Sequence, residues 1–236
     1  MVYITGDVHG CWDKREEFLQ SLNKEDIVIC LGDLGWSWDI NHINGFCPSA
    51  IWLSVLGNHE NYSLIEKMPV IKKFGGKVRQ MKENVFYLMN GEMYKIEGKK
   101  YFVFGGALSV DKHWRKPYID WWPEEQPTKG DLDNAMKTLK KHNWKFDYFL
   151  THTGDTEQVQ QVLRTKDTVN DSTEKMIQEI KYQIKEHNGS FDIHMFGHLH
   201  CFWVQHDFCT WGSTGYTWYC LYTQIYDPET RNIKSF

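Results

Sequence analysis

Short apolar runs alternate with amphipathic segments along this chain, which is the pattern of an α/β protein. Five runs are rich in β-branched and aromatic residues and end at a glycine or a polar residue: 2–5, 27–31, 51–56, 148–151 and 193–196. Such runs are typical of buried strands. Runs at 85–89, 93–97 and 100–104, joined by Asn90-Gly91 and Gly98-Lys99, predict a meander. Two late strands are expected at 202–205 and 221–226.

Three segments between these runs show the helical period, with apolar side chains on one stripe. They are 11–22, 131–141 and about 172–187. At the start of the last one, Asp171 and Glu174 resemble a capping arrangement, and Gly189 closes it. The chain contains no internal repeat, low-complexity tract or linker. We therefore expect residues 1–236 to form a single α/β domain.

The polar residues that follow the apolar runs are of the types that bind metal ions. Such side chains stand at the ends of five runs, at Asp7, His9, Asp33, Asn58, His152, His198 and His200. Ligands in open α/β sheets gather beyond the carboxyl ends of the strands, so these side chains are expected to converge. Residues two apart, as in Asp7 with His9, point to the same side of an extended backbone and face one ion cluster.

This ligand set also limits the choice of metal. It holds two carboxylates, four imidazoles and one amide oxygen, and it holds no thiolate. Such a set suits Mn²⁺, Fe or Zn²⁺ better than Ca²⁺ or Cu(I). We expect two divalent metal ions, with Mn²⁺ favoured and Fe or Zn²⁺ as alternatives.

The motifs that carry these residues resemble the complete motif set of the calcineurin-like metallophosphoesterases. They are Gly6-Asp7-Val8-His9-Gly10, Gly32-Asp33, Gly57-Asn58-His59-Glu60, His152 and Gly197-His198-Leu199-His200. The match runs from residue 6 to residue 200. The resemblance implies the family's fold, a four-layer α-β-β-α sandwich of two mixed sheets with flanking helices. It also implies the family's activity, the metal-dependent hydrolysis of phosphate esters.

The resemblance further implies a role for each site residue. The first metal would be held by Asp7, His9 and His200, and the second by Asn58, His152 and His198. Asp33 would bridge both ions, which at a separation of roughly 3.5–4 Å pin a hydroxide for in-line attack on phosphorus. His59 is the candidate acid or hydrogen-bond donor for the departing alkoxide. Glu60 is the candidate partner that orients it.

Two stretches bear on the substrate. Protein serine/threonine phosphatases and related dinucleoside tetraphosphatases carry an arginine shortly after the bridging aspartate, whereas 34–39 contains none. A second block, 105–115 followed by 121–125, resembles a segment of a bacterial and phage subgroup. Within it, Arg115 is the candidate phosphate clamp, because a guanidinium offers a planar bidentate fork. The alternative is a surface arginine that pairs with Glu124 or Glu125.

Eleven tryptophans form another unusual feature. Several fall outside the expected strands, at Trp36, Trp38, Trp114, Trp121, Trp122, Trp211 and Trp218. They are either packing residues that close loops or a pocket wall on which a nucleobase stacks. Trp36 and Trp38 are the best candidates for stacking, because they follow a metal ligand directly. His113 is ambiguous between a substrate contact and a structural role.

Composition narrows the possible partners and location. A net charge of −4 offers no broad cationic surface, so long duplex nucleic acid is not an expected partner. Lys72-Lys73 and 137–142 are interpreted as the solvated faces of helices. The chain has no apolar run of about eighteen residues and no leader pattern, which predicts a cytoplasmic protein. Six cysteines without a C-x-x-C pair indicate reduced thiols.

Three function classes compete on this basis. The first is a dinuclear-metal-dependent phosphoesterase that hydrolyses a small phosphodiester or phosphomonoester, with a nucleotide-like substrate favoured. The second is a short-strand nuclease or a protein phosphatase that uses the same centre. The third is a catalytically inactive binding module. Every ligand position and His59 are filled, which disfavours the third class, and the oligomeric state is left open.

Overall fold

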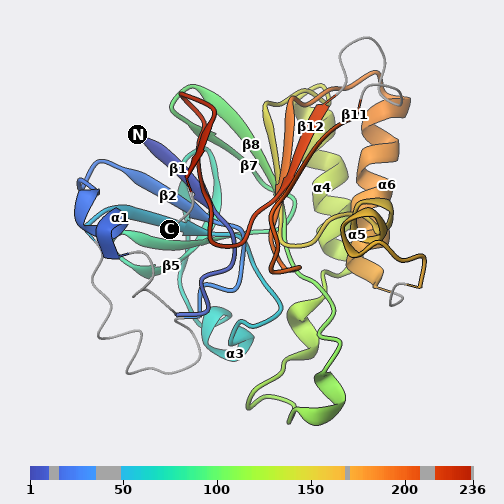
Figure 1. Cartoon of the computed structure of the whole chain (residues 1–236), viewed down its shortest axis with the longest axis horizontal. Coiled ribbons are helices and arrows are strands. Elements are labelled where there is room, and N and C mark those ends of the chain that lie inside the picture. Colours follow the sequence, from blue (N-terminus) through green and yellow to red (C-terminus); the bar gives the residue numbers. More distant parts are fainter. Residues whose placement is uncertain (11–15, 36–48, 168–170, 208–215, 235–236) are drawn as a thin grey trace.

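Two β-sheets pack face to face, with helices on their outer surfaces (Figure 1). This arrangement is seen in a computed structural model that describes residues 1–10, 16–35, 49–167, 171–207 and 216–234. The α/β four-layer sandwich expected from the sequence is confirmed.

The first sheet is built on four parallel strands, β1 (Val2–Thr5), β2 (Ile27–Cys30), β3 (Ile51–Ser54) and β6 (Val85–Leu88). Antiparallel strands extend it on both sides: β13 (Ile225–Asp227) and β14 (Asn232–Lys234) beside β1, and β5 (Gly76–Lys82) and β4 (Val70–Lys73) beside β6. The strand order is β14-β13-β1-β2-β3-β6-β5-β4.

The second sheet also has a parallel centre, formed by β8 (Lys99–Phe104), β9 (Tyr148–Thr151), β10 (Ile193–Phe196) and β12 (Tyr216–Cys220). Antiparallel strands close its two edges, β7 (Met93–Ile96) beside β8 and β11 (Trp203–Asp207) beside β12. Within each sheet, the carboxyl ends of the central strands therefore lie at the same edge.

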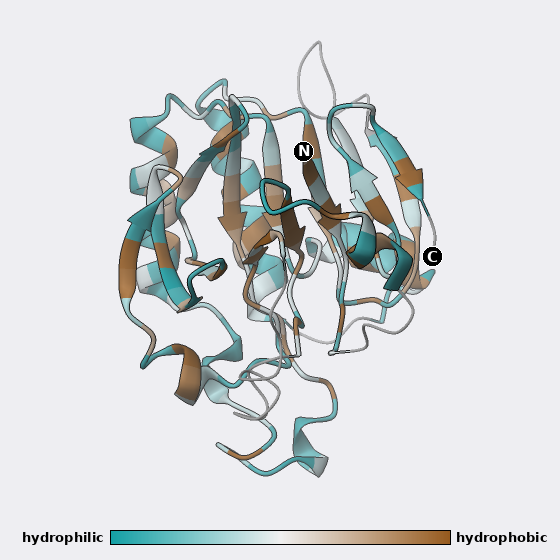
Figure 2. Cartoon of the chain, turned by 90° about the vertical axis from the view of Figure 1, so that its left-hand side faces the viewer, coloured by the Kyte–Doolittle hydropathy of each residue, from teal (hydrophilic) through white to brown (hydrophobic). Residues whose placement is uncertain are grey.

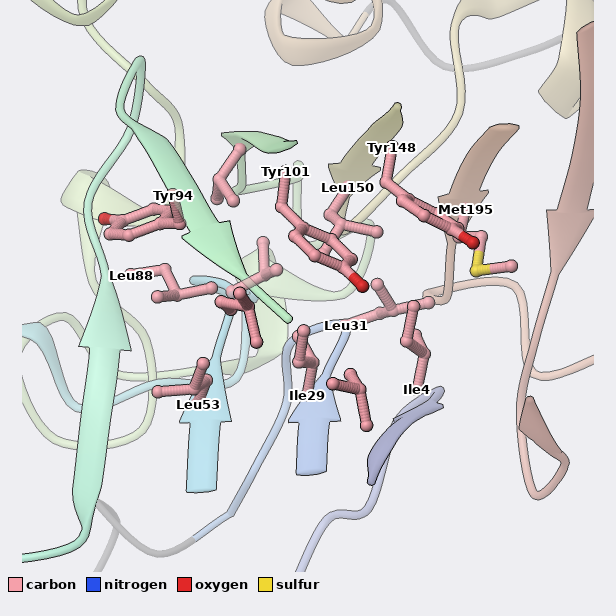
Figure 3. Packing of buried hydrophobic residues seen from close by; sticks show 14 of the residues in the cluster. Ile4, Ile29, Leu31, Leu53, Leu88, Tyr94, Tyr101, Tyr148, Leu150 and Met195 are labelled. Carbon is pink, nitrogen blue, oxygen red and sulfur yellow. The ribbon is translucent and has the colours of Figure 1, made fainter. Parts of the chain in front are cut away.

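The main core lies between the two sheets. Figure 3 shows Ile4, Ile29 and Leu53 of the first sheet facing Tyr101, Leu150 and Met195 of the second. All six side chains are buried, and removing such surfaces from water is the main force that holds the sheets together.

Helices cover the outer faces of both sheets. On the second sheet, α4 (Lys129–Lys141), α5 (Thr156–Leu163) and α6 (Ser172–Glu186) lie side by side (Figure 1). On the first sheet, α1 (Glu16–Ser21) buries Phe18 against Val28 and Trp52. Shorter elements are α3 (Tyr62–Ile65) and the 3₁₀ turns η2 (Lys112–Trp114) and η3 (Pro123–Glu125). Figure 2 shows the hydrophobic residues concentrated on the strands and the loops mainly hydrophilic.

The predicted meander is wrong at its first connection. β6 belongs to the first sheet and β7 to the second, so Asn90-Gly91 is a crossover between sheets. Gly91 has φ +74° and lies against α4, where a Cβ would stand 2.6 Å from the Ala135 backbone nitrogen. The strand expected at 221–226 is wrong over most of its length, because residues 221–224 form a crossover from β12, which ends at Cys220, to β13, which begins at Ile225 in the other sheet.

Other boundaries differ from the sequence prediction by small amounts. α4 begins at Lys129, two residues early, because Thr128 and Asp131 form a capping box. Lys72-Lys73 lies on the edge strand β4 and not on a helix, where lysines discourage pairing with another chain. The helix expected at 11–22 is described only from Glu16. Strands β4, β5, β12 and β14 and helices α3 and α5 were not expected.

Glu174 does not complete the predicted capping arrangement of α6. Asp171 caps the helix by accepting a hydrogen bond from the Thr173 N–H (2.7 Å), whereas the Glu174 side chain is buried. Burial, with the neighbouring charge of Asp171, raises the pKa of Glu174 to about 7. The folded protein therefore holds this proton more tightly than the unfolded chain does.

A pH-dependent stability follows from this buried carboxyl group. Because the folded-state pKa is raised, stability falls as the pH rises from about 4.5 to about 7. Glu174→Gln is therefore expected to raise the free energy of unfolding by about 1–3 kcal/mol at pH 8 and to change it little at pH 4.5. Urea titrations at the two pH values measure this difference, and an equal gain at both would contradict it.

Candidate metal centre

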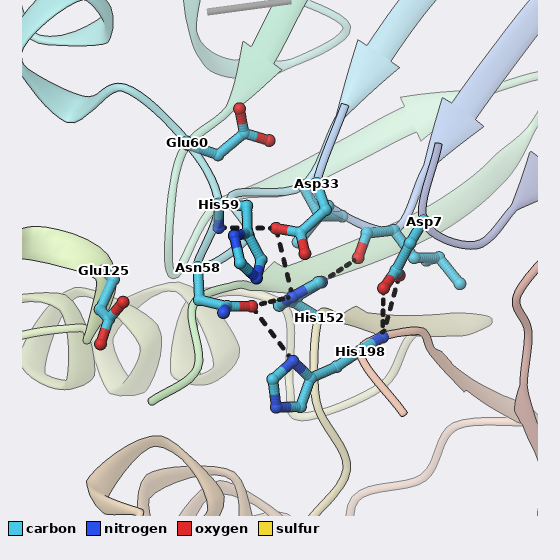
Figure 4. Close-up of polar contacts among 12 residues, drawn as sticks. Asp7, Asp33, Asn58, His59, Glu60, Glu125, His152 and His198 are labelled. Atoms are coloured by element: carbon cyan, nitrogen blue, oxygen red, sulfur yellow. Dashed lines mark hydrogen bonds and ion pairs between the residues drawn. The ribbon is translucent and has the colours of Figure 1, made fainter. Parts of the chain in front are cut away.

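The structure brings all seven predicted ligands together at the carboxyl ends of β1, β2, β3, β9 and β10. Figure 4 shows five of them, Asp7, Asp33, Asn58, His152 and His198, pointing toward one another. Four of these side chains are buried, and His198 is partly exposed. The convergence expected from the strand ends is therefore present.

One group of side chains surrounds the Asp7 carboxylate. His200 Nε2 lies 3.2 Å from Asp7 Oδ2, and His9 Nε2 lies 3.7 Å from the same oxygen. The two imidazole nitrogens are 2.9 Å apart. These three side chains can offer their ligand atoms to one cation.

A second group surrounds the Asn58 amide oxygen. Asn58 Oδ1 lies 2.8 Å from His152 Nε2 and 3.1 Å from His198 Nδ1. Asp33 lies between the groups, with Oδ1 at 3.5 Å from His152 Nε2 and Oδ2 at 3.7 Å from His9 Nε2. Asp33 is thus the carboxylate that faces both sets of nitrogens.

The hydrogen bonds of His152 show that this cluster suits a cation. Its Nδ1 donates to the Leu31 carbonyl (2.7 Å), so Nε2 of the neutral ring carries a lone pair. In that neutral form the lone pair faces the Asn58 oxygen, which is also an acceptor, so either a proton or a metal ion must stand between the two atoms. In addition, Asp33 Oδ2 is buried without a hydrogen-bond partner in the described part of the chain. Divalent cations satisfy such a convergence of acceptors.

The electrostatics of the cluster are consistent with a cation site. Burial acts to lower the pKa of His152, but Asp33, Asp7 and the Leu31 carbonyl outweigh it and raise the pKa to about 10. Burial opposes ionisation of Asp7, yet hydrogen bonds from His200 and His9 lower its pKa to about 2. The same negative groups that hold a proton on His152 would attract a metal ion in its place.

The ligand loops reach this geometry through left-handed backbone, which corrects the prediction of extended segments. His9, Asp33, His198 and His200 have φ values of 50°, 52°, 65° and 51°. Such conformations each cost on the order of 1–3 kcal/mol in non-glycine residues and cluster at functional sites. Hydrogen bonds between loops hold them, with the His198 N–H on Asp7 Oδ1 (2.9 Å) and the His59 N–H on Asp33 Oδ1 (2.8 Å).

Arg115 reaches the site from the segment between β8 and α4. Its Nη1 lies 2.8 Å from His59 Nδ1, and its Nε and Nη2 both donate to Asp111 Oδ2, at 3.0 and 2.8 Å. The alternative of a surface arginine paired with Glu124 or Glu125 is therefore wrong. The Glu60 carboxylate accepts from the Leu34 N–H (3.0 Å) and the Tyr87 hydroxyl (3.2 Å), and its role as the partner that orients His59 stays a prediction.

His59 is held as a neutral ring. Burial lowers its pKa, and the Arg115 guanidinium adds to this effect against the opposing charge of Asp33. A guanidinium can only donate hydrogen bonds, and Arg115 lies closer to His59 Nδ1 (2.8 Å from Nη1) than to His59 Nε2 (3.4 Å from Nη2), so Nδ1 is the nitrogen that accepts. The proton of the neutral ring then sits on Nε2.

Sequence reasoning missed two residues next to the centre, Ser109 and Glu125. Asn58 Nδ2 donates to Ser109 Oγ (3.0 Å), and Ser109 Oγ donates to Glu125 Oε2 (2.6 Å). Both residues lie in the block formed by 105–115 and 121–125, in which the sequence pointed to Arg115 and His113 and named Glu125 only as a possible partner of Arg115. No local pattern distinguishes them, since their role depends on contact with a loop about fifty residues earlier in the chain.

The tryptophans outside the expected strands differ in their burial, so some are packing residues and others are exposed. Trp218 lies in β12 and is fully buried, which contradicts its placement in a loop, and Trp122 is also buried. Trp114, in contrast, is 82 % exposed and packs against His113. The best stacking candidates, Trp36 and Trp38, and also Trp211 lie outside the described residues.

A family model for the calcineurin-like phosphoesterases matches residues 1–202. The chain therefore belongs to this family, and it is a metal-dependent phosphoric ester hydrolase that acts with divalent metal ions. No curated protein matches the chain. In the described part of the structure, every helix is too short or too polar to cross a membrane. The resemblance of 105–115 and 121–125 to a bacterial and phage subgroup stays a prediction.

Proposed function

We propose that this protein is a dinuclear phosphoesterase that hydrolyses a small phosphodiester or phosphomonoester, with nucleotide-like substrates favoured. The observation that carries the proposal is the position of Asp33 between two groups of ligands. Asp7, His9 and His200 would hold one ion, and Asn58, His152 and His198 the other, with Asp33 shared by both. Mn²⁺ is the favoured metal for this set of oxygen and nitrogen ligands.

When bound, the two ions supply an acidified water as nucleophile and positive charge for the phosphoryl oxygens. The chain supplies the geometry. Hydrogen bonds from the His198 and His59 N–H groups fix the carboxylates of Asp7 and Asp33. The Leu31 carbonyl fixes the ring of His152. Ligands that are held in place before the substrate binds need no rearrangement during the reaction.

His59 and Arg115 form the side of the site that meets the ester. With Nδ1 facing Arg115, the Nε2–H of His59 is available as a donor to the oxygen on which charge develops. Arg115 is anchored by Asp111, so its guanidinium is oriented before the substrate arrives. We assign His59 as the donor to the leaving oxygen and Arg115 as the phosphate-binding residue.

The charge balance of the molecule supports a small substrate. The net charge is −4, which disfavours binding of a long nucleic acid, while the metal ions and Arg115 supply the local positive charge that a small phosphate ester needs. A nucleobase would stack on the loop tryptophans, of which Trp36 and Trp38 follow Asp33 most directly. We place the protein in the cytoplasm as a single domain, 1–236.

A substrate panel tests this function. Mono-, di- and cyclic nucleotides, a plain alkyl phosphodiester, phosphopeptides and oligonucleotides would be incubated with the Mn²⁺-loaded protein and with His59→Ala. We expect the wild-type protein to turn over nucleotide esters fastest and His59→Ala to lose about 10²- to 10³-fold in kcat. Preferred cleavage of oligonucleotides or phosphopeptides would favour the alternative classes. Equal rates on alkyl and nucleotide diesters would remove the stacking pocket from the proposal.

Removal of the Arg115 side chain tests the phosphate-binding role. Arg115→Ala is expected to lower kcat/KM for a phosphate ester by about 10- to 100-fold, because a charge-assisted contact to the phosphoryl oxygens is lost. The neighbouring Lys116, which is exposed, provides the control, and Lys116→Ala should leave kcat/KM unchanged. Steady-state kinetics with saturating Mn²⁺ measure both. Equal values for Arg115→Ala and the wild type would show that Arg115 does not bind the substrate.

A further inference from the structure

A chain of buried hydrogen bonds leads from the candidate metal centre into the segment 105–127. Asn58 Nδ2 donates to Ser109 Oγ at 3.0 Å, and Ser109 Oγ donates to Glu125 Oε2 at 2.6 Å. The Ser109 backbone N–H donates to the other oxygen, Glu125 Oε1, at 2.9 Å. Asn58 is 3 % exposed, and Ser109 and Glu125 are each 1 % exposed. Figure 4 shows Glu125 on the far side of Asn58 from the other ligands.

The direction of these hydrogen bonds determines how the Asn58 amide faces. An asparagine side chain has nearly the same shape in its two orientations, which exchange the oxygen and the NH₂ group. Glu125 accepts the Ser109 hydroxyl proton, so the Ser109 oxygen can only accept toward Asn58. That acceptor selects the Asn58 NH₂ group, and the Asn58 oxygen then points at His152 and His198.

The segment that carries this pair is fixed at both of its ends. The Leu108 N–H and the Gln126 side chain both donate to the Asp171 carboxylate, at 2.9 Å each. Within the segment, Trp122 Nε1 donates to Ser63 Oγ of α3 at 2.8 Å. Figure 1 shows the green part of this segment extending below the sheets near α3. The Ser109–Glu125 pair is therefore held by anchors that do not themselves contact Asn58.

We propose that Ser109 and Glu125 are positioning residues that orient the Asn58 amide and thereby set the affinity of the metal site that uses Asn58. This inference rests on the proposed dinuclear function. The other group, Asp7, His9 and His200, does not depend on this chain of hydrogen bonds. Residues that orient a ligand typically contribute 10- to 100-fold to metal affinity. The loss should therefore fall on one of two metal ions.

Ser109→Ala is the first test, read by Mn²⁺ uptake in equilibrium dialysis and by the electron paramagnetic resonance signal of coupled Mn²⁺ pairs. We expect the wild-type protein to bind two equivalents. In Ser109→Ala, one equivalent should bind about 10- to 100-fold more weakly while the other is unchanged. Ser63→Ala is the matched control, because it removes an anchor of the same segment without touching Asn58, and it should bind both ions normally.

Glu125→Gln is the second test and keeps the packing of the buried side chain. A glutamine NH₂ group can donate to Ser109 Oγ, and the Ser109 hydroxyl then donates toward Asn58 and favours the flipped amide. The expected loss of one Mn²⁺ equivalent is at least as large as in Ser109→Ala. This variant also covers the case in which Ser109→Ala fails to fold.

A double substitution separates orientation from general damage. In Asn58→Asp, both outer atoms are oxygens, so the side chain presents a ligand in either orientation. In Asn58→Asp, the Ser109 oxygen faces a carboxylate oxygen and no longer the amide NH₂ group. Adding Ser109→Ala to Asn58→Asp should therefore leave Mn²⁺ affinity unchanged or raise it. A further loss equal to that of Ser109→Ala alone would overturn the orientation argument.

The outcomes distinguish this inference from the proposed function. Two Mn²⁺ equivalents and normal hydrolysis in the wild type, with Ser109→Ala and Glu125→Gln binding Mn²⁺ like Ser63→Ala, would overturn the inference alone. Uptake of fewer than two equivalents by the wild type would overturn the dinuclear function and the inference with it.

Discussion

Asp33→Asn is expected to lower kcat by at least about 10³-fold and to reduce the Mn²⁺ stoichiometry below two. The His59 N–H donates to Asp33 Oδ1 (2.8 Å), so the amide oxygen of an asparagine would take that position. Its NH₂ group would then replace Oδ2, the buried atom that lies 3.7 Å from His9 Nε2 and has no hydrogen-bond partner in the described structure. A donor would stand where both metal ions need a shared anion.

The measurement combines kinetics with metal analysis of the same samples. Asp192→Asn is the control, because Asp192 is an exposed carboxylate that directly precedes β10, and it should keep full activity and both ions. Full Mn²⁺ occupancy in Asp33→Asn, with activity within tenfold of the wild type, would mean that Asp33 is not the shared ligand.

Gly57→Ala is expected to cause the second large loss of activity, although it adds only a single methyl group. A Cβ at position 57 would stand 2.1 Å from Asp33 Oδ1 and 2.3 Å from the Asp33 backbone nitrogen. Both atoms belong to a ligand loop that is itself in a left-handed conformation, so relief of the clash must move Asp33. We expect kcat to fall by about 10²-fold or more and the free energy of unfolding to fall by about 1–3 kcal/mol.

Gly130→Ala is the matched control for this substitution. Gly130 lies in the first turn of α4, where the nearest atom to a new Cβ is Thr128 Oγ1 at 3.4 Å. This variant should retain activity and gain slightly in stability, since alanine favours helix more than glycine does. Normal activity and metal binding in Gly57→Ala would contradict the close approach of the Asn58 and Asp33 loops.

The glycines beside the ligands share one physical purpose. A Cβ at Gly32 would stand 2.3 Å from His152 Nδ1, and a Cβ at Gly197 would stand 2.1 Å from Asp7 Oδ1. At each place, the glycine of one motif lets a ligand of another motif approach its backbone. The glycines in the motifs therefore serve the packing of ligand loops against one another as much as the turn of the local chain.

Local patterns in the sequence were sufficient to predict the strands that carry the ligands of the site. The central strands that precede the ligands appear at the expected positions because each is buried on both faces and therefore reads as a continuous apolar run. The sequence predicts a helix face for Lys72 and Lys73, which lie on the edge strand β4, because an exposed edge strand carries no such run.

The placement of these elements depended on contacts between distant segments. Residues Asn90 and Gly91 have the composition of a hairpin turn, yet the chain crosses there from one sheet to the other. The crossover buries Tyr94, whose hydroxyl donates to the Lys77 carbonyl and accepts from the Met89 N–H. No property of the dipeptide itself distinguishes these outcomes.

By itself, the sequence determined which side chains form the candidate site and that they lie at strand ends, because ligand types and apolar runs are local properties. Only the tertiary structure decided that Arg115 meets His59 and that Ser109 and Glu125 support Asn58. It also decided that the ligand loops turn through left-handed backbone. These features arise from hydrogen bonds and close packing between loops that are far apart in the chain, and such contacts leave no periodic signal in the sequence.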